Sequence, residues 1–259
     1  MQRRPRIDWP TRWQQLVRAM ARVHTAEGEH QLLDWLLRPT EPRVLAFVNA
    51  HAMNMVVESE PFFHSLMSAD VVVRDGIGVA VLLRLLNQPP GQNLNGTDLI
   101  PRLLEGADGM PVALFGTQDP WLTKAREVLA ERVAPRSPCV VAHGFLDVRE
   151  YIKCAVRHRP AVIVLGMGMP RQEEVAIQLR SALNYPCLIV CGGAIIDFLG
   201  GKVPRAPGWM RKTGLEWTFR LAREPRRLWG RYVRGNPVFL RRALVVAARS
   251  LFQRRAVVA

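Results

Sequence analysis

The sequence predicts a parallel α/β fold, in which helices flank a sheet, followed by a basic helical tail. From about residue 41 to residue 201, short apolar runs alternate with amphipathic stretches. Runs that are apolar throughout are typical of strands covered on both faces. Residues 202–259, called the basic tail below, hold 15 lysines and arginines but two acids, so they carry +13 of the formal net charge of +14. We therefore expect an N-terminal helical segment over 1–40, an α/β body over 41–201 and the tail over 202–259.

Six apolar runs predict the strands of this body, and an amphipathic stretch follows almost every one. The predicted strands are Val44–Ala50, Asp70–Asp75, Met110–Gly116, Pro138–Gly144, Ala161–Gly168 and Cys187–Gly193. The predicted helices cover 52–67, 77–86, 97–107, 119–133, 147–158 and 170–183. Strands that alternate with helices pair in parallel, because each helix returns the chain to the same end of the sheet.

Composition narrows the class of protein. With 49% apolar residues the body is not a disordered chain. Residues 1–24 lack the apolar stretch of a secretory signal, and no run reaches the ~20 apolar residues that cross a bilayer. The four cysteines show no C-x-x-C spacing, and Cys187 and Cys191 lie in an apolar run. We expect buried free thiols in a reducing cytoplasm and no zinc site.

Candidate site residues lie where the predicted strands end, because ligands of parallel sheets bind outside the carboxyl ends of the strands. Asp75 comes directly after one strand and before a helix, in the stretch "RDGIGVAV". A carboxylate at that place can take a proton from a hydroxyl. It can equally cap the following helix by accepting backbone N–H bonds. The sequence leaves both interpretations open.

Two glycine turns follow the most apolar strands. Gly166 and Gly168 stand in "GMGMPRQEE", where Pro170 opens a helix whose free N–H groups could hold a diphosphate. An ordinary turn is the alternative, since Arg171 replaces the last glycine of a dinucleotide-binding G-x-G-x-x-G. Gly192 and Gly193 form the second turn.

Other polar residues have weaker signals. Asp197 and Arg205 either form an ion pair that docks the tail or belong to the functional site, and Thr97 in "NGTDL" would cap the next helix. His51 either contacts a ligand or is structural. The chain has no D-x-D triplet, so no motif suggests a metal held by two close carboxylates.

The tail predicts helices near 209–223, 226–234 and 238–253, separated by prolines. In the last helix Leu240, Leu244 and Leu251 share one face with Ala247 and Ala248, whereas Arg242 and Arg249 lie on another. Tryptophans interleave with the arginines of the tail. Such a segment binds nucleic acid, lies on an anionic membrane, or is only a solvated face. The body contains no nucleic-acid-binding module, which favours the membrane.

These motifs resemble the WecG/TagA/CpsF glycosyltransferases, glycosyltransferase family 26. The resemblance runs from about Asn49 to Tyr232 and rests on "DG-x-G-V", "NGTDL", "GMGMPRQE", "GGAIIDFLGG" and "RAPGWMRKTGLEWTFRLAREPRRLWGRY". It implies a Rossmann-like catalytic core and inverting, metal-independent transfer of a hexose or N-acetylhexosamine from a UDP-sugar to a polyprenyl-diphosphate-linked sugar. It places that reaction in surface or exopolysaccharide biosynthesis, at the cytoplasmic face of the inner membrane. The appendage would dock there peripherally and help complete the active site.

The resemblance also assigns roles to residues. Asp75 falls on the family's base and Gln172 on its PRQE glutamine, so both are predicted to be catalytic. Arg220, Arg227 and Arg231 would neutralise diphosphate charge. The remaining predicted substrate-binding residues are Asn49, Asn93, Asn95, Gly166, Gly168, Arg171, Gly192, Gly193 and Arg205.

Two positions depart from the family pattern. Phe47 replaces a threonine of many members, and Asn93 replaces an arginine thought to stabilise the departing nucleotide, so that another arginine would have to replace it. These departures favour the xanthan-type subgroup, which uses UDP-glucose and a glucosyl diphospholipid. The alternatives are a membrane-associated nucleotide-binding protein without turnover and a basic nucleic-acid-binding protein. We expect no cofactor and no nucleic-acid partner, and the sequence leaves a homo-oligomer open.

Overall fold

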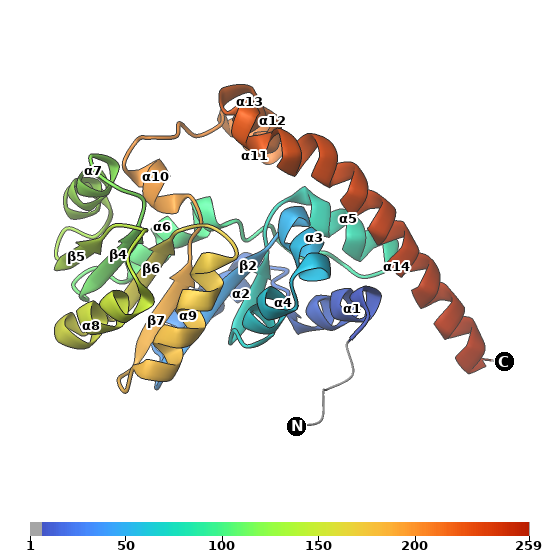
Figure 1. The fold of residues 1–259 in the computed structure, drawn as a ribbon, viewed down its shortest axis with the longest axis horizontal. Coiled ribbons are helices and arrows are strands. Elements are labelled where there is room, and N and C mark those ends of the chain that lie inside the picture. Colours follow the sequence, from blue (N-terminus) through green and yellow to red (C-terminus); the bar gives the residue numbers. More distant parts are fainter. Residues whose placement is uncertain (1–6, 259) are drawn as a thin grey trace.

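The protein is built around a seven-stranded parallel sheet, seen in a computed structural model that describes residues 7–258 (Figure 1). The strand order is β1-β3-β2-β7-β6-β4-β5. The strands are β1 (Met20–Ala21), β2 (Pro42–Val48), β3 (Val71–Arg74), β4 (Val112–Gly116), β5 (Cys139–Ala142), β6 (Val162–Gly166) and β7 (Cys187–Cys191). The predicted α/β class is confirmed, and all six predicted strands are present. Residues 1–6 of the predicted N-terminal segment, and residue 259, lie outside the described residues.

Helices cover both faces of the sheet and divide its core into two clusters. One cluster takes side chains from α1 (Trp9–Ala19), α3 (Ala50–Glu58), α4 (Glu60–Met67), α5 (Ile77–Leu85), α8 (Val148–His158), α9 (Arg171–Ala182) and α14 (Gly235–Val258). The other takes them from α2 (Ala26–Leu37), α6 (Gly96–Gly106), α7 (Trp121–Val128) and α10 (Ile195–Leu199). Successive residues of β2 alternate between the clusters, with Val44, Ala46 and Val48 in the first and Leu45 and Phe47 in the second. This alternation explains why the strand is apolar throughout.

Three short helices and two π-helical turns complete the chain. They are η1 (Leu129–Val133), α11 (Gly208–Lys212), α12 (Glu216–Arg223), α13 (Pro225–Trp229) and η2 (Gly230–Arg234). The described cysteines are free thiols, and Cys187 and Cys191 are buried as predicted.

The sequence missed β1, a strand of two residues in the N-terminal segment that pairs with β3. The single helix predicted over 52–67 is wrong, because the chain forms α3 and α4 there. Ser59 caps α4 by accepting a hydrogen bond from the Phe62 N–H, and Pro61 lies in the first turn, so a new helix starts at that point.

The predicted boundaries within the tail are also wrong. The helix expected over 209–223 is interrupted at Gly214, whose φ of +76° breaks it into α11 and α12. The helices expected over 226–234 and 238–253 are instead continuous from α13 through η2 into α14. Pro237 does not separate them, since it lies in the first turn of α14 directly after the π-helical turn.

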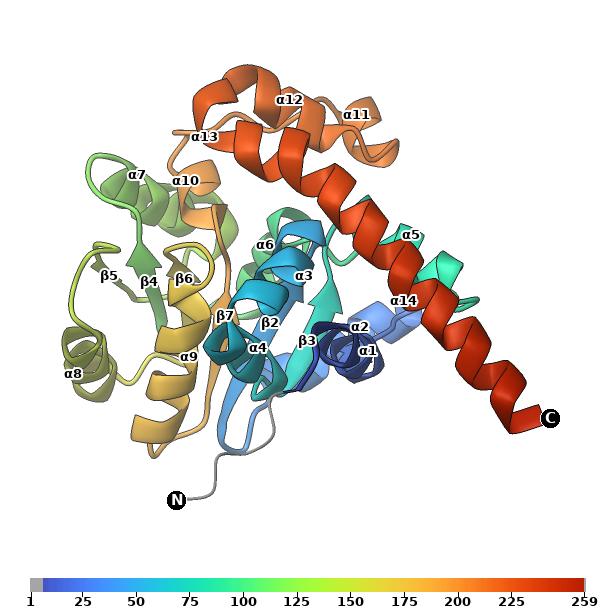
Figure 2. The same cartoon turned by 45° about the vertical axis from the view of Figure 1, so that its right-hand side comes forward.

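Helix α14 lies across α1, α3 and α5, and its carboxyl end extends past the body (Figure 2). It packs through Phe239, Ala243, Val246 and Ala247, and the rings of Phe239 and Trp13 are 5.3 Å apart between centroids. The leucines of the face predicted from the sequence, Leu240, Leu244 and Leu251, are exposed, whereas Ala247 of that face is packed.

Arg242 and Arg249, which the sequence places on one face of the last helix, both contact the body. The Arg242 guanidinium donates to the Asn54 side chain at 3.0 Å and lies 3.9 Å from Glu58. Arg249 is paired with Asp8 at 3.0 Å. Both side chains hold the helix against the body. Among the described residues, no helix combines the length and apolar character needed to cross a bilayer.

We predict that Phe239→Ala lowers the free energy of unfolding by about 3–5 kcal/mol, because it empties a fully packed aromatic site at the joint between tail and body. The ring is 1% exposed, whereas its neighbour Leu240 is 46% exposed. Leu240→Ala is therefore the matched control and should cost no more than about 0.5 kcal/mol. Urea unfolding followed by tryptophan fluorescence compares the two. Equal losses would contradict the packing described here.

Candidate active site

A cavity of about 1510 Å³ lies between the carboxyl ends of the central strands and the tail. Residues after β2, β3, β6 and β7 form its floor, and α12, α13 and η2 form the opposite wall. It contains twelve of the fourteen residues predicted from the sequence: Asn49, Asp75, Asn93, Asn95, Gly166, Gly168, Gln172, Gly192, Gly193, Arg220, Arg227 and Arg231. Arg171 and Arg205 do not line it.

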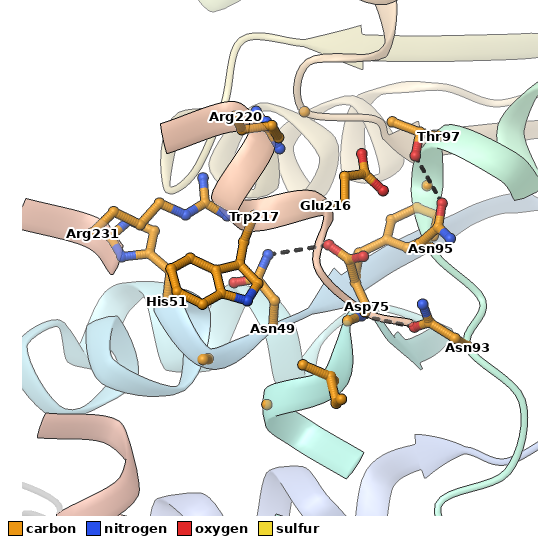
Figure 3. A pocket seen from close by; sticks show the side chains of 18 of the residues that line it. Asn49, His51, Asp75, Asn93, Asn95, Thr97, Glu216, Trp217, Arg220 and Arg231 are labelled. Carbon is orange, nitrogen blue, oxygen red and sulfur yellow. Dashed lines mark hydrogen bonds between the residues drawn. The ribbon is translucent and has the colours of Figure 1, made fainter. Parts of the chain in front are cut away.

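Asp75 follows β3 at the centre of this cavity (Figure 3). Its Oδ2 accepts a hydrogen bond from the Asn49 side chain, 3.2 Å away. Asn49 is itself fixed as the cap of α3 and accepts from the Ala52 N–H. Helix α5 begins after Gly76 without a side-chain cap, so the capping interpretation of Asp75 is wrong. The carboxylate is held by one amide and faces open space.

Asn93 and Arg74 shape the chain beside Asp75. The Asn93 Oδ1 accepts from the Gly76 N–H at 2.7 Å and from Arg74 at 3.2 Å. The buried Arg74 guanidinium also donates to the carbonyls of Gly76, Pro90 and Gly91. Both side chains are thus engaged in holding loop 90–93 against the end of β3. Burial lowers the pKa of Arg74, but the group stays charged at neutral pH.

Gln172 joins the two glycine turns. Its Oε1 accepts from the N–H groups of Gly168 and Gly193, at 3.2 and 2.8 Å. Its Nε2 donates to Glu173 and to the Cys191 carbonyl. Two acceptor and two donor bonds use the full capacity of an amide. The side chain is 1% exposed, so this glutamine positions the turns around the cavity.

These bonds, with one from Gly192, occupy the N–H groups of three glycines in the two turns. The N–H groups of Gly168 and Gly193 point to Gln172, and that of Gly192 donates to the Leu165 carbonyl at 2.8 Å. These three groups are therefore not free to bind a diphosphate. Gly168 and Gly193 are needed for backbone shape, with φ of +80° and +61°.

Asp98 docks the tail at the edge of the cavity, in place of the predicted Asp197. Its Oδ1 lies 2.6 Å from Arg205 and 3.1 Å from Arg211. Burial would raise the pKa of Asp98, but hydrogen bonds from Asn95 and Arg205 and the charge of Arg211 lower it overall. The predicted pair of Asp197 with Arg205 is wrong, since Asp197 pairs with Lys202 at 3.1 Å.

Two further predictions fail near these residues. Asn95 caps α6 by accepting from the Asp98 N–H, whereas Thr97 donates to Asn95 and caps nothing. Arg171 is exposed and donates to the Leu146 carbonyl.

The tail brings arginines to the cavity from the side opposite the strands. Arg220 lies over the Phe198 ring, and Arg231 lies beside Tyr232. The Nε atoms of both arginines are buried without a hydrogen-bond partner among the described residues. Arg227 also lines the cavity but is bound to Glu224 through two nitrogens. Buried, unpaired guanidinium groups are costly, and an anionic ligand would satisfy them.

Sequence reasoning missed Glu216 and left His51 undecided, although both line the cavity (Figure 3). Burial, followed by the charge of Arg231, lowers the pKa of His51 to about 4, so its ring is neutral at pH 7. No local sequence signal marks Glu216, because only the folding of the tail over the body brings α12 to the ends of the strands. The described residues form no cluster of three or more His, Cys, Asp or Glu side chains suited to a metal ion.

Comparison with known proteins agrees with this geometry. Residues 15–255 match the sequence model of a family described as the glycosyl transferase WecG/TagA/CpsF family. A relative from Staphylococcus aureus (strain MW2) is 27% identical over 196 residues, which cover 74% of this chain and 76% of that protein. One from Bacillus subtilis (strain 168) is 27% identical over 191 residues, 73% of this chain and 74% of that protein. Both are named N-acetylglucosaminyldiphosphoundecaprenol N-acetyl-beta-D-mannosaminyltransferase.

We predict that Glu173 makes folding stability depend on pH. Its side chain is 1% exposed, and burial raises its pKa from 4.5 to about 8. Below pH 4.5 the Glu173 carboxyl is neutral in both the folded and the unfolded protein. Between pH 4.5 and pH 8 it ionises in the unfolded chain but stays neutral in the folded protein, so the free energy of unfolding falls as the pH rises. The raised pKa corresponds to a loss of free energy of unfolding on the order of 5 kcal/mol across this range.

Glu173→Gln should remove most of that slope, as measured by chemical unfolding between pH 5 and pH 8. Glu127→Gln is the matched control, because it removes an exposed carboxylate on α7, whereas the charge of Glu174 itself raises the pKa of Glu173. A wild-type slope that survives Glu173→Gln would assign the pH dependence to other groups.

Proposed function

The chain belongs to the WecG/TagA/CpsF glycosyltransferase family, and we propose that it transfers a sugar from a UDP-sugar to a polyprenyl-diphosphate-linked sugar. One observation carries the proposal. The cavity places the open carboxylate of Asp75 opposite the unpaired guanidinium groups of Arg220 and Arg231. A transferase needs a base for the acceptor hydroxyl and positive charge for the departing diphosphate.

The proposed reaction uses these groups in one displacement. Asp75 takes the proton of the acceptor hydroxyl, and the hydroxyl oxygen forms a bond to the anomeric carbon of the donor. The bond from that carbon to the diphosphate breaks on the opposite side, so the configuration inverts, and its electron pair leaves with UDP. Arg220 and Arg231 stabilise the charge on the diphosphate, because this partly buried site screens them less than water does. Asn49 orients the base.

We propose a hexose or N-acetylhexosamine as the transferred sugar. The names of the relatives support an N-acetylhexosamine. Phe47, which lines the cavity where many family members have threonine, supports a donor pocket of different shape. A panel of radiolabelled UDP-sugars, offered with defined lipid diphosphate sugars, tests the proposal and identifies the donor. If the enzyme transfers a sugar from none of these donors, the proposed function is wrong.

We further propose that the enzyme works as a peripheral protein at the cytoplasmic face of the inner membrane, in surface polysaccharide synthesis. Exposed apolar side chains on the tail support this location: Trp209, Trp229, Leu240, Leu244, Leu251 and Phe252. Such side chains insert among lipid headgroups. Nucleic-acid binding is less well supported, since several tail arginines turn inward to Asp98, Asn54 and Asp8.

Asp75→Asn should lower kcat by at least about 100-fold, because an amide cannot accept the hydroxyl proton. The amide oxygen still accepts from Asn49, so the melting temperature should stay near that of the wild type. Asp34→Asn, which changes an exposed carboxylate on α2, is the control. A near wild-type kcat for Asp75→Asn would remove Asp75 from the mechanism.

We expect different residues of the tail to bind the diphosphate and to bind the membrane. Arg231→Ala should lower kcat/KM by roughly 10- to 100-fold even with a short, water-soluble acceptor, because the diphosphate loses a charged donor. Arg226→Ala is the matched control, since Arg226 lies exposed on α13 outside the cavity.

Membrane location is tested with a second variant. Leu244→Asp combined with Leu251→Asp should reduce sedimentation with anionic vesicles and leave turnover of the soluble acceptor unchanged. These leucines are 58% and 51% exposed, so their loss spares the packed core. Equal vesicle binding by this variant and the wild type would contradict the proposed docking face.

We propose that transfer needs no metal, with the arginines supplying the positive charge that a divalent cation supplies elsewhere. Turnover in excess EDTA should then equal turnover in Mg²⁺. Loss of activity in chelator, restored by Mg²⁺ or Mn²⁺, would show the opposite.

A further inference from the structure

Glu216 is an acidic residue in the cavity wall formed by the tail, whose other charged residues at the cavity are arginines. The tail has two acids, and the other, Glu224, is bound to Arg227. Glu216 is the first residue of α12 and lines the cavity as a partly buried side chain. Among the described residues it has no hydrogen bond or ion pair, even though Arg205 and Arg220 lie near enough to influence it. A carboxylate that a basic segment leaves unpaired inside a cavity is available to a ligand.

The surroundings of Glu216 indicate which part of a ligand it meets. In Figure 3 it lies on the side of Asp75, Asn95 and Thr97, whereas Arg231, Trp217 and His51 lie on the other side. Burial raises the pKa of Glu216, the charges of Arg205 and Arg220 oppose this shift, and the weaker effects of Asp75 and Asp98 add to it. Asp98 is paired with Arg205 and Arg211, whereas Asp75 and Glu216 are two neighbouring carboxylates without an ion pair among the described residues. That end of the cavity suits a neutral group rich in hydroxyls better than a diphosphate.

We propose that Glu216 is a specificity-determining residue that accepts a hydrogen bond from the acceptor sugar, at a hydroxyl or amide N–H next to the reacting hydroxyl. This inference rests on the proposed function. The acceptor sugar, rather than the donor sugar, is assigned because its reacting hydroxyl must reach Asp75, which lies beside Glu216. A sugar held between Asp75 and Glu216 has its attacking oxygen fixed in direction, which is the main requirement of a displacement.

The first part of the test measures acceptor and donor kinetics for three proteins: wild type, Glu216→Gln and Glu216→Ala. Both variants should lower kcat/KM for a short lipid diphosphate acceptor, by about 10- to 100-fold for alanine, while the KM of the UDP-sugar stays unchanged. Glu127→Gln, an exposed acid on α7, is the matched control for loss of one negative charge.

The second part removes the acceptor group instead of the protein group. Deoxy acceptors, each lacking one hydroxyl, are offered to the wild type and to Glu216→Ala. With the wild type, one deoxy acceptor should have a kcat/KM lower than that of the intact acceptor, by about the factor that Glu216→Ala causes with the intact acceptor. With Glu216→Ala, the same deoxy acceptor should have the same kcat/KM as the intact acceptor. This coupling does not depend on how the variant folds, because each protein is compared with itself.

Three results would overturn the inference. Equal penalties for every deoxy acceptor in both proteins, or a change in donor KM instead of acceptor kinetics, would remove Glu216 from the acceptor sugar and leave the proposed transferase intact. A wild type that transfers no sugar to any lipid diphosphate sugar would remove the proposed function, and this inference with it.

Discussion

The structure depends on the burial of one face of α14 against the α/β body. Phe239 packs on Trp13, and Ala243 and Val246 continue the contact along the helix. This apolar contact holds the end of the tail, while Asp98 holds its beginning through Arg205 and Arg211. Between these two attachments the chain must pass over the carboxyl ends of the strands. The cavity is therefore closed by a segment fixed on both sides, and its second wall exists only because the tail is docked.

The chemistry of the cavity follows from charges that the protein itself does not neutralise. Most arginines of the tail that face the body have a partner there, as Arg242 and Arg249 do. Arg220 and Arg231 instead keep buried nitrogens without a partner, and Asp75 keeps a carboxylate bonded only to an amide. Unpaired groups cost free energy in the empty protein. In the proposed reaction, the donor diphosphate and the acceptor hydroxyl would together recover that cost.

A second set of residues gives the cavity its shape. Gln172 uses all of its hydrogen bonds to hold two glycine turns together, and Arg74 does the same for the loop beside Asp75. Gln172 lies in the motif to which the resemblance assigned a catalytic role, and Arg74 directly precedes Asp75. Motif membership marks the neighbourhood of a site, whereas burial and hydrogen bonding separate the residues that touch a ligand from those that position others.

The sequence by itself determined the sheet, the basic tail and the position of the site at the strand ends. Each depends on local pattern: apolar runs form buried strands, and polar residues such as Asn49 and Asp75 follow them. The tertiary structure decided which face of α14 is buried, which acid holds Arg205, and that Glu216 faces the cavity. The leucines of α14 and its Phe239 face are both apolar, so periodicity could not choose between them. Likewise Asp98 and Asp197 are equally good partners for an arginine in sequence. Such choices depend on which surfaces the folded chain brings together, and contacts between residues more than a hundred positions apart leave no local signal.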